Sequence, residues 1–222
     1  MATGLGAIPV YALGPDRMRR LGPGMWGVVI GVMAVASVQG LLIPGFRDGS
    51  AASVLGGATV GVVFLLGAKR RLRGRTGPLV ILVLFVHSLP EGLALGAAWA
   101  SATAGLGLFV FVAIAIQNVP EGTAAAIPLR EEGRVSAVRA FWIATMTSAP
   151  QPVGAVLAYE LVETSRSLLP ASLGFAAGAM LALVVVELVP TAARSDRPRE
   201  AWAGALVSAA SMVGLGAALS VG

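Results

Sequence analysis

Two stretches of this sequence, thirty residues apart, repeat one pattern: HSLPEG at 87–92 and QNVPEG at 117–122. Each lies inside an apolar run long enough to cross a bilayer as a helix, which takes about 20 residues. In each, a proline precedes a glutamate, and another polar side chain stands four positions before that glutamate. A carboxylate at the bilayer centre costs roughly 2.5–3.5 kcal/mol or more, so such a residue usually has a partner and a function. The repeat therefore indicates a site inside a membrane.

Helical spacing predicts which side chains of the repeat share a face. Positions four apart lie on one side of a helix, so His87 should stack on Glu91, and Gln117 on Glu121. If the two helices pack together, one imidazole, two carboxylates and an amide oxygen converge, a donor set that suits zinc. Taken singly, each residue could be an ordinary buried histidine, a paired glutamate or a membrane proline. Their repetition at equal depth favours a metal site.

The prolines of the repeat predict two local breaks. Pro90 and Pro120 have no N–H, so the carbonyls of Val86 and Ile116 should lack their helical donor. In lipid, a free carbonyl is tolerated only where neighbouring groups, water or a cavity satisfy it. We therefore expect both prolines to loosen their helices beside a lined pathway.

Composition predicts that the whole chain is a membrane protein. Apolar residues make up 56% and charged residues 12% of its 222 positions, against roughly 25% charged in a soluble domain, and the mean hydropathy is +0.84. Seven apolar runs could span a bilayer: 25–46, 51–68, 78–102, 105–129, 136–159, 169–193 and 201–221. An earlier run, Ala2 to Gly14, is too short, and we interpret it as the second half of a span whose start is missing, with a re-entrant segment as the alternative. The expected fold class is all-α: one domain over 1–222, a polytopic membrane bundle of eight transmembrane helices with the first truncated.

The positions of the basic residues predict the topology. Lys and Arg are enriched on the cytoplasmic side of membrane proteins. Here 14 of the 16 basic residues fall in four alternate loops, and the other side has only Arg47 and Arg166. Both termini should therefore lie outside. A nucleic-acid surface, which needs positive charge gathered on one face, is not expected.

Small residues recur at the four-residue spacing that lets helix backbones approach closely in lipid. General packing is favoured over a dedicated dimer face for these pairs, and a homodimer stays open. The pairs are Gly27/Gly31, Gly57/Gly61, Gly92/Gly96 and Gly174/Gly178.

The motifs resemble those of the ZIP (Zrt/Irt-like) divalent metal transporters, in particular the GufA-type bacterial branch. The resemblance spans nearly the whole chain, in HSLPEGLALGAA, IQNVPEGTAAAIPL, GLGAIPVYALG, ASVQGLLIP, SAPQPVGA and GAMLALVVVELVP. It implies a secondary transporter that moves divalent transition metals into the cytoplasm, zinc first, with cadmium, iron and manganese as alternatives. It also implies a midplane site between the fourth and fifth helices, and an elevator-like motion of the helices that hold it.

By motif position, the resemblance assigns a primary metal site to four residues: His87, Glu91, Gln117 and Glu121. In the family, the two glutamates bridge to a second ion. That second site would be completed here by Ser88, Asn118 and Gln151.

Departures from the family pattern weaken the second site. The family usually has Asn at the position of Ser88, its GufA-type branch often has Asp at Asn118, and that branch usually has a carboxylate at Gln151. The lost negative charge predicts a weak or empty second site and a protein that works chiefly with one ion. In the seventh span, Val186 replaces a family histidine, and Glu187 remains as a candidate exit-path ligand, with a structural hydrogen bond as the alternative.

Other function classes fit the sequence less well. No G-x-x-x-x-G-K-[ST] stretch indicates a nucleotide site, and a membrane metalloprotease would be expected to carry His-Glu-x-x-His or a comparable set, whereas this chain has one histidine. We therefore expect no enzyme, no catalytic residues and no cofactor, with zinc as transported substrate. A metal-binding or sensing protein that transports nothing stays open, because a fold does not determine a function. The absence of an organelle signal predicts a prokaryotic plasma membrane.

Overall fold

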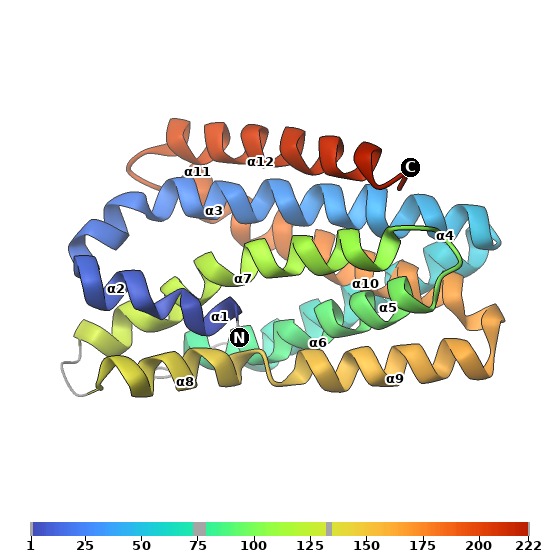
Figure 1. Ribbon diagram of the computed structural model, residues 1–222, viewed down its shortest axis with the longest axis horizontal. Helices are drawn as coiled ribbons and strands as arrows, with labels where there is room; N and C mark the ends of the chain where they lie inside the picture. Colours follow the sequence, from blue (N-terminus) through green and yellow to red (C-terminus); the bar gives the residue numbers. More distant parts are fainter. Residues whose placement is uncertain (1, 73–78, 132–134, 222) are drawn as a thin grey trace.

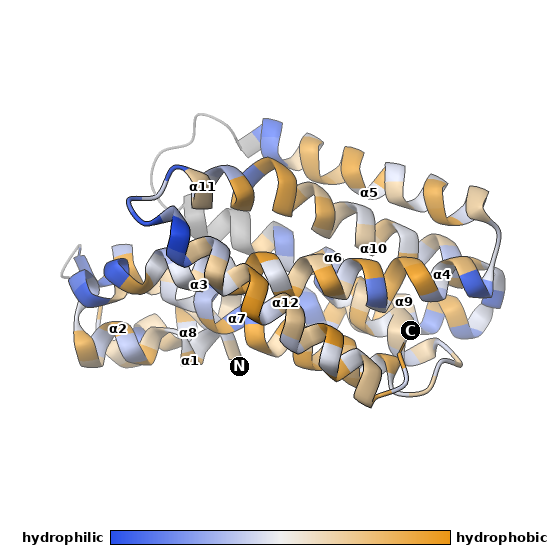
Figure 2. Ribbon diagram, turned by 90° about the horizontal axis from the view of Figure 1, so that it is seen from above, coloured by the Kyte–Doolittle hydropathy of each residue, from blue (hydrophilic) through white to orange (hydrophobic). Residues whose placement is uncertain are grey.

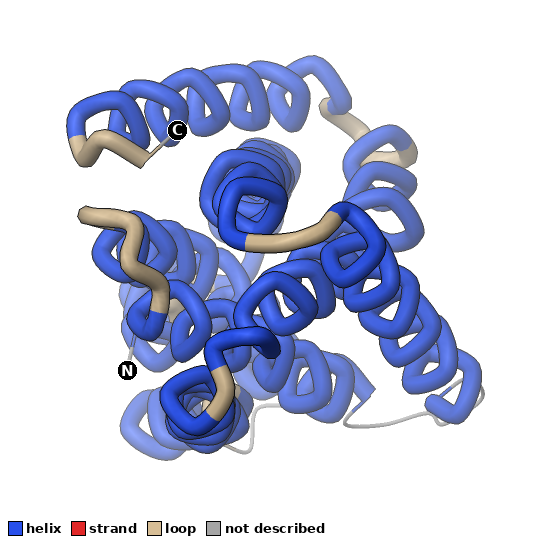
Figure 3. Tube along the Cα trace, turned by 90° about the vertical axis from the view of Figure 1, so that its right-hand side faces the viewer, coloured by secondary structure: helices blue, strands red, loops and turns tan. Residues whose placement is uncertain are grey.

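The computed structural model describes residues 2–72, 79–131 and 135–221, with backbone alone for 72, 79–84 and 86. The described residues form helices and turns, with no strand among them (Figures 1 and 3). The α-helices are α1 Ala2–Leu5, α2 Ala7–Leu13, α3 Pro15–Ser37, α4 Ile43–Asp48, α5 Ala51–Leu72, α6 Leu79–Ala100, α7 Leu106–Glu131, α8 Ala137–Thr147, α9 Pro150–Thr164, α10 Leu169–Leu183, α11 Val189–Ala193 and α12 Pro198–Ala218. Two π-helical segments, Val38–Leu42 and Val184–Leu188, and a 3-10 turn, Arg166–Leu168, join some of them end to end.

These elements make eight successive segments, which confirms the predicted polytopic helical fold. Five continuous helices in the described part of the chain are long and apolar enough to cross a membrane. The first segment, Ala2–Leu13, is short, as the sequence predicted, and is divided by a turn at Gly6. The loops that contain the described part of the four basic groups lie at one end of the bundle, and those of Arg47 and Arg166 at the other (Figures 1 and 2). Which end faces the cytoplasm stays a prediction.

Two segment boundaries differ from the apolar runs. The second segment begins at Pro15 rather than near residue 25, because proline at the first helical position loses no hydrogen bond. The expected sixth span is two helices, α8 and α9, with a turn at Ser148 and Ala149. Pro150 stands in the first turn of α9, where its missing N–H loses no hydrogen bond and its fixed φ suits the start of a helix.

Pro90 and Pro120 do not end their helices, and the expectation that the carbonyls of Val86 and Ile116 lack a helical donor beside a polar pathway stays a prediction. Both α6 and α7 continue as α-helices through these residues. Membrane helices tolerate proline when small local adjustments or neighbouring groups satisfy the freed carbonyl. The irregular backbone lies elsewhere, in the two π segments and in the turn between α8 and α9.

The small-residue pairs are used for packing within the chain. Gly27 and Gly31 of α3 lie against the backbone of α12, and Gly92 and Gly96 of α6 lie against α9. The glycine pairs of α5 and α10 lie at the contact between these two helices, where each glycine packs against the backbone of the other helix. A Cβ at any of these positions would overlap a neighbouring backbone atom. Close helix approach in lipid explains their spacing without a dimer face.

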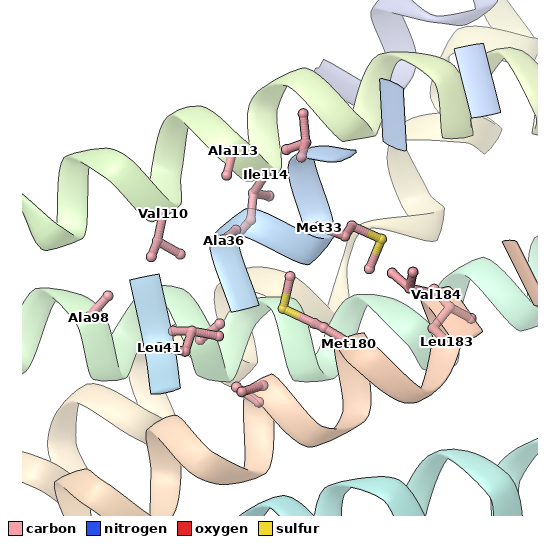
Figure 4. Packing of buried hydrophobic residues seen from close by; sticks show 14 of the residues in the cluster. Met33, Ala36, Leu41, Ala98, Val110, Ala113, Ile114, Met180, Leu183 and Val184 are labelled. Carbon is pink, nitrogen blue, oxygen red and sulfur yellow. The ribbon is translucent and has the colours of Figure 1, made fainter. Parts of the chain in front are cut away.

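The apolar core lies where α3, α6, α7 and α10 meet. Figure 4 shows Met33 and Ala36 of α3, Val110 and Ile114 of α7, and Met180 of α10 gathered in one cluster. In lipid, such packing between helices supplies contact energy rather than the removal of apolar groups from water. This core holds α6 and α7 side by side, with the repeated motif of each near its middle.

Candidate metal centre

Three of the predicted ligands come together between α6 and α7. Atoms of His87, Glu91 and Glu121 that could bind a metal all lie within 4.8 Å of one another. The three side chains are 3%, 0% and 4% exposed. His87 Nε2 is 3.7 Å from Glu91 Oε1, the stacking that the four-residue spacing predicted. Two carboxylates and an imidazole therefore share a small buried volume.

Gln117 also lies in this cluster, which contains polar atoms without a hydrogen-bond partner. Its Nε2 donates a hydrogen bond to Glu91 Oε1, and the side chain is fully buried. Its Oε1 has no hydrogen-bond partner, and neither ring nitrogen of His87 has one. Buried polar groups nearly always find partners, so each exception calls for an explanation such as a bound ion. A cation in this cluster would be bound by Gln117 Oε1 and by one ring nitrogen of His87, since the other ring nitrogen of a neutral imidazole carries the proton.

Asn118 and Gln151 form an amide pair beside Glu91. Gln151 Nε2 donates to Glu91 Oε2 at 2.5 Å and to Asn118 Oδ1 at 3.2 Å. Asn118 Nδ2 donates back to Gln151 Oε1 at 3.2 Å. Both predicted second-site amides therefore lie at the cluster, and both oxygens of Glu91 accept an amide hydrogen. Gln151 reaches this position from α9, where Pro150 begins the helix.

Ser88 turns toward the irregular backbone of the sixth segment. Its hydroxyl donates to the carbonyl of Thr147 at 2.9 Å. In a continuous helix, the N–H of Gln151 would bond that carbonyl, but here it bonds Ser148 O at 3.0 Å. The serine therefore satisfies a backbone group freed by the turn. Its predicted role as a ligand stays a prediction.

The short first segment packs on residues next to the centre, a contact that the sequence analysis missed. The hydroxyls of Thr3 and Ser148 share a hydrogen bond. Thr123, two residues after Glu121, donates a hydrogen bond to Gly6 O at 2.9 Å. Gly122 itself lies against the backbone of Thr3. A threonine or serine hydroxyl within an apolar run is the sequence signal that could have indicated these contacts, because such groups bond across membrane helices.

Glu187 lies apart from the cluster and has a cationic partner. Its Oε2 is 3.2 Å from Lys69 Nζ, and both side chains are 35% exposed. A lysine at a helix end can extend its long side chain toward a charged group. Glu187 occupies the π segment Val184–Leu188, and its role as an exit-path ligand stays a prediction.

The arrangement of the centre suits reversible binding of one divalent cation. Nitrogen and oxygen donors without thiolate favour zinc and similar first-row ions over soft metals. The two carboxylates supply the opposite charge, and among the described residues no lysine or arginine is ion-paired with either. Ligands must be deprotonated to bind a metal, so loading the centre would exchange protons for the ion.

Comparisons with known proteins identify relatives of this chain. A family model described as ZIP Zinc transporter matches residues 68–221. Zinc transporter GufA of Myxococcus xanthus is 36% identical over 232 residues, covering 91% of this chain and 89% of that protein. Zinc transporter ZIPB of Bordetella bronchiseptica is 33% identical over 244 residues, covering 98% and 78%. A longer protein of Arabidopsis thaliana is 33% identical over 234 residues, 96% of this chain but 36% of its own length.

The family match includes both Pro-Glu-Gly motifs and the helices that bring Gln151 and Glu187 to their positions. The bacterial relatives extend the similarity to the first segments of the chain. On these matches, the protein belongs to the ZIP zinc transporter family, in its GufA-type bacterial branch.

Proposed function

We propose that this protein carries zinc, or a similar divalent ion such as cadmium, iron or manganese, across a membrane toward the cytoplasm. Each ion passes through the centre formed by His87, Glu91, Gln117 and Glu121. The similarity to GufA and ZIPB, which are both named zinc transporters, supports transport as the activity. The ZIP family is one of transporters rather than enzymes. The whole of residues 1–222 acts as one transport domain.

One observation carries the assignment of the centre. Two buried carboxylates, without a lysine or arginine ion-paired with them in the described chain, adjoin three buried atoms that have no hydrogen-bond partner. Those atoms are Gln117 Oε1 and the two ring nitrogens of His87. A core built only for stability would not leave these polar atoms unpaired beside acids, because an unsatisfied buried polar group costs about 1–3 kcal/mol. A transiently bound cation balances the charge of the acids and accounts for Gln117 Oε1 and for one ring nitrogen of His87, the other of which carries the proton.

Zinc flux into liposomes tests the proposal. Purified full chain is reconstituted, and zinc entry is followed with a trapped fluorescent indicator. Glu91→Gln and Glu121→Gln keep the side-chain volume but remove a negative charge, and each is expected to abolish flux. Glu163→Gln is the matched control, because Glu163 is an exposed acid whose ion pair among the described residues is with Arg166, at 2.7 Å. Equal flux in all three variants would overturn the assignment.

The same vesicles separate transport from sensing. Zinc binding by equilibrium titration without any flux would favour a non-transporting metal-binding or sensing protein of the same fold.

The proposed location is the plasma membrane of a prokaryote, with both termini outside. Accessibility of terminal tags to a protease added outside the cell would test this orientation. A homodimer stays a prediction. The small-residue pairs do not support it, because they are occupied by contacts within the chain.

A further inference from the structure

We propose that the side-chain amide of Gln151 takes the place of a second ion and positions Glu91 to bind a single one. The inference rests on the proposed function, since it concerns the same centre. It goes beyond a loss of charge at the second site: the position is filled by the protein's own hydrogen-bond donor.

The amide nitrogen of Gln151 lies between oxygen atoms that a second cation would use. It is 2.5 Å from Glu91 Oε2 and 3.2 Å from Asn118 Oδ1. A primary amide has two N–H hydrogens, and each has one of these acceptors. The oxygen of the same amide accepts from Asn118 Nδ2 at 3.2 Å. The two amides are therefore hydrogen-bonded to each other, and the amide of Gln151 is also hydrogen-bonded to Glu91.

The backbone holds this amide in position. Gly92, next to Glu91, lies so close to the backbone of Gln151 that an added Cβ would be 2.8 Å from Gln151 Cα. Gly154, one turn further along α9, lies against the carbonyl of Leu89 in the same way. Pro150 begins α9 immediately before Gln151. The distance between Glu91 and Gln151 is thus set by direct contact of two helices.

The arrangement divides the two oxygens of Glu91 between two tasks. Oε2 is held by Gln151, whereas Oε1 faces His87 and Gln117. Groups that hydrogen-bond a metal ligand fix its orientation, and their loss typically lowers metal affinity about 10–100-fold. Gln151 is therefore a positioning residue for the single ion, and Asn118 keeps its amide in the required orientation.

Zinc titration of purified full-length variants tests the inference. Gln151→Leu keeps approximately the volume but removes the donor, without adding a metal ligand. It is expected to lower zinc affinity about 10–100-fold with one ion still bound per chain. Gln39→Leu is the matched control, because Gln39 is another part-buried glutamine whose amide bonds Val221 O at 2.7 Å, away from the centre. The control is expected to bind zinc like the unsubstituted protein.

Gln151→Glu gives an independent arm, whether or not the leucine variant folds. A carboxylate in place of the amide adds charge and removes the donor, so two ions per chain are expected. Unchanged affinity in a folded Gln151→Leu protein, one ion in Gln151→Glu, or two ions in the unsubstituted protein would each overturn the inference. Failure of the transport proposal would be seen separately, as absent zinc flux in liposomes containing the unsubstituted protein.

Discussion

Replacing Gly92 with alanine should weaken zinc binding through the backbone alone. The new Cβ would lie 2.8 Å from both the Cα and the carbonyl carbon of Gln151. Ordinary van der Waals contacts begin near 3.4 Å, so α9 must retreat by at least about 0.6 Å. Functional groups need to be held within about 0.5 Å of their productive positions. The hydrogen bond from Gln151 to Glu91 should therefore lengthen or break.

Two other glycines separate this effect from general destabilisation. Gly27→Ala creates a similar overlap with Ala201, at the contact of α3 with α12, and Gly214→Ala meets no atom within 4 Å. All three alanine variants gain about 1 kcal/mol of helix propensity. Gly92→Ala and Gly27→Ala also lose about 1–3 kcal/mol to overpacking. Gly92→Ala and Gly27→Ala should thus have similar thermal stability, below that of Gly214→Ala.

Zinc titration should rank the same variants differently. Only Gly92→Ala disturbs a residue that bonds a proposed ligand, so its zinc affinity should fall about tenfold or more, while the other two bind like the unsubstituted protein. Thermal unfolding in detergent, followed by circular dichroism, gives the stability ranking on the same samples. An equal loss of affinity in Gly27→Ala, or none in Gly92→Ala, would refute the reasoning.

Further predictions concern contacts outside the centre. Thr123→Val leaves the Gly6 carbonyl without its hydroxyl donor and should destabilise the protein by about 1–3 kcal/mol, measured by thermal unfolding; an unchanged midpoint would contradict it. Lys69→Gln removes the cation beside Glu187 and should allow one more weakly bound ion per chain, detected by equilibrium dialysis and absent again when Glu187→Gln is added. Arg19→Gln breaks an exposed ion pair with the last residue of α7, 2.5 Å long, and should cost no more than about 1 kcal/mol; a cost that persists in 1 M salt would argue against a surface pair.

Local sequence patterns were sufficient to predict the membrane fold and the stacking of His87 on Glu91. Apolar run length predicts a bilayer-spanning helix because the thickness of the hydrocarbon layer is nearly constant. The four-residue spacing brings His87 onto Glu91 because helical geometry repeats every 3.6 residues. An acid in the middle of such a run indicates function because lipid penalises an unpaired charge. None of these inferences requires knowledge of which helices are neighbours.

Tertiary structure decided the features that depend on neighbours. The family resemblance assigned Gln151 to the second site, but only the packing of α9 on α6 shows its amide hydrogen-bonded to Glu91. The pairing of Glu187 with Lys69 likewise depends on the contact of two segments far apart in the chain. Even the effect of Pro90 was decided by surroundings, since a proline ring predicts a lost hydrogen bond but not whether the helix continues. Side-chain type and spacing are local properties of the chain, whereas hydrogen-bond partners are set by which helix surfaces meet.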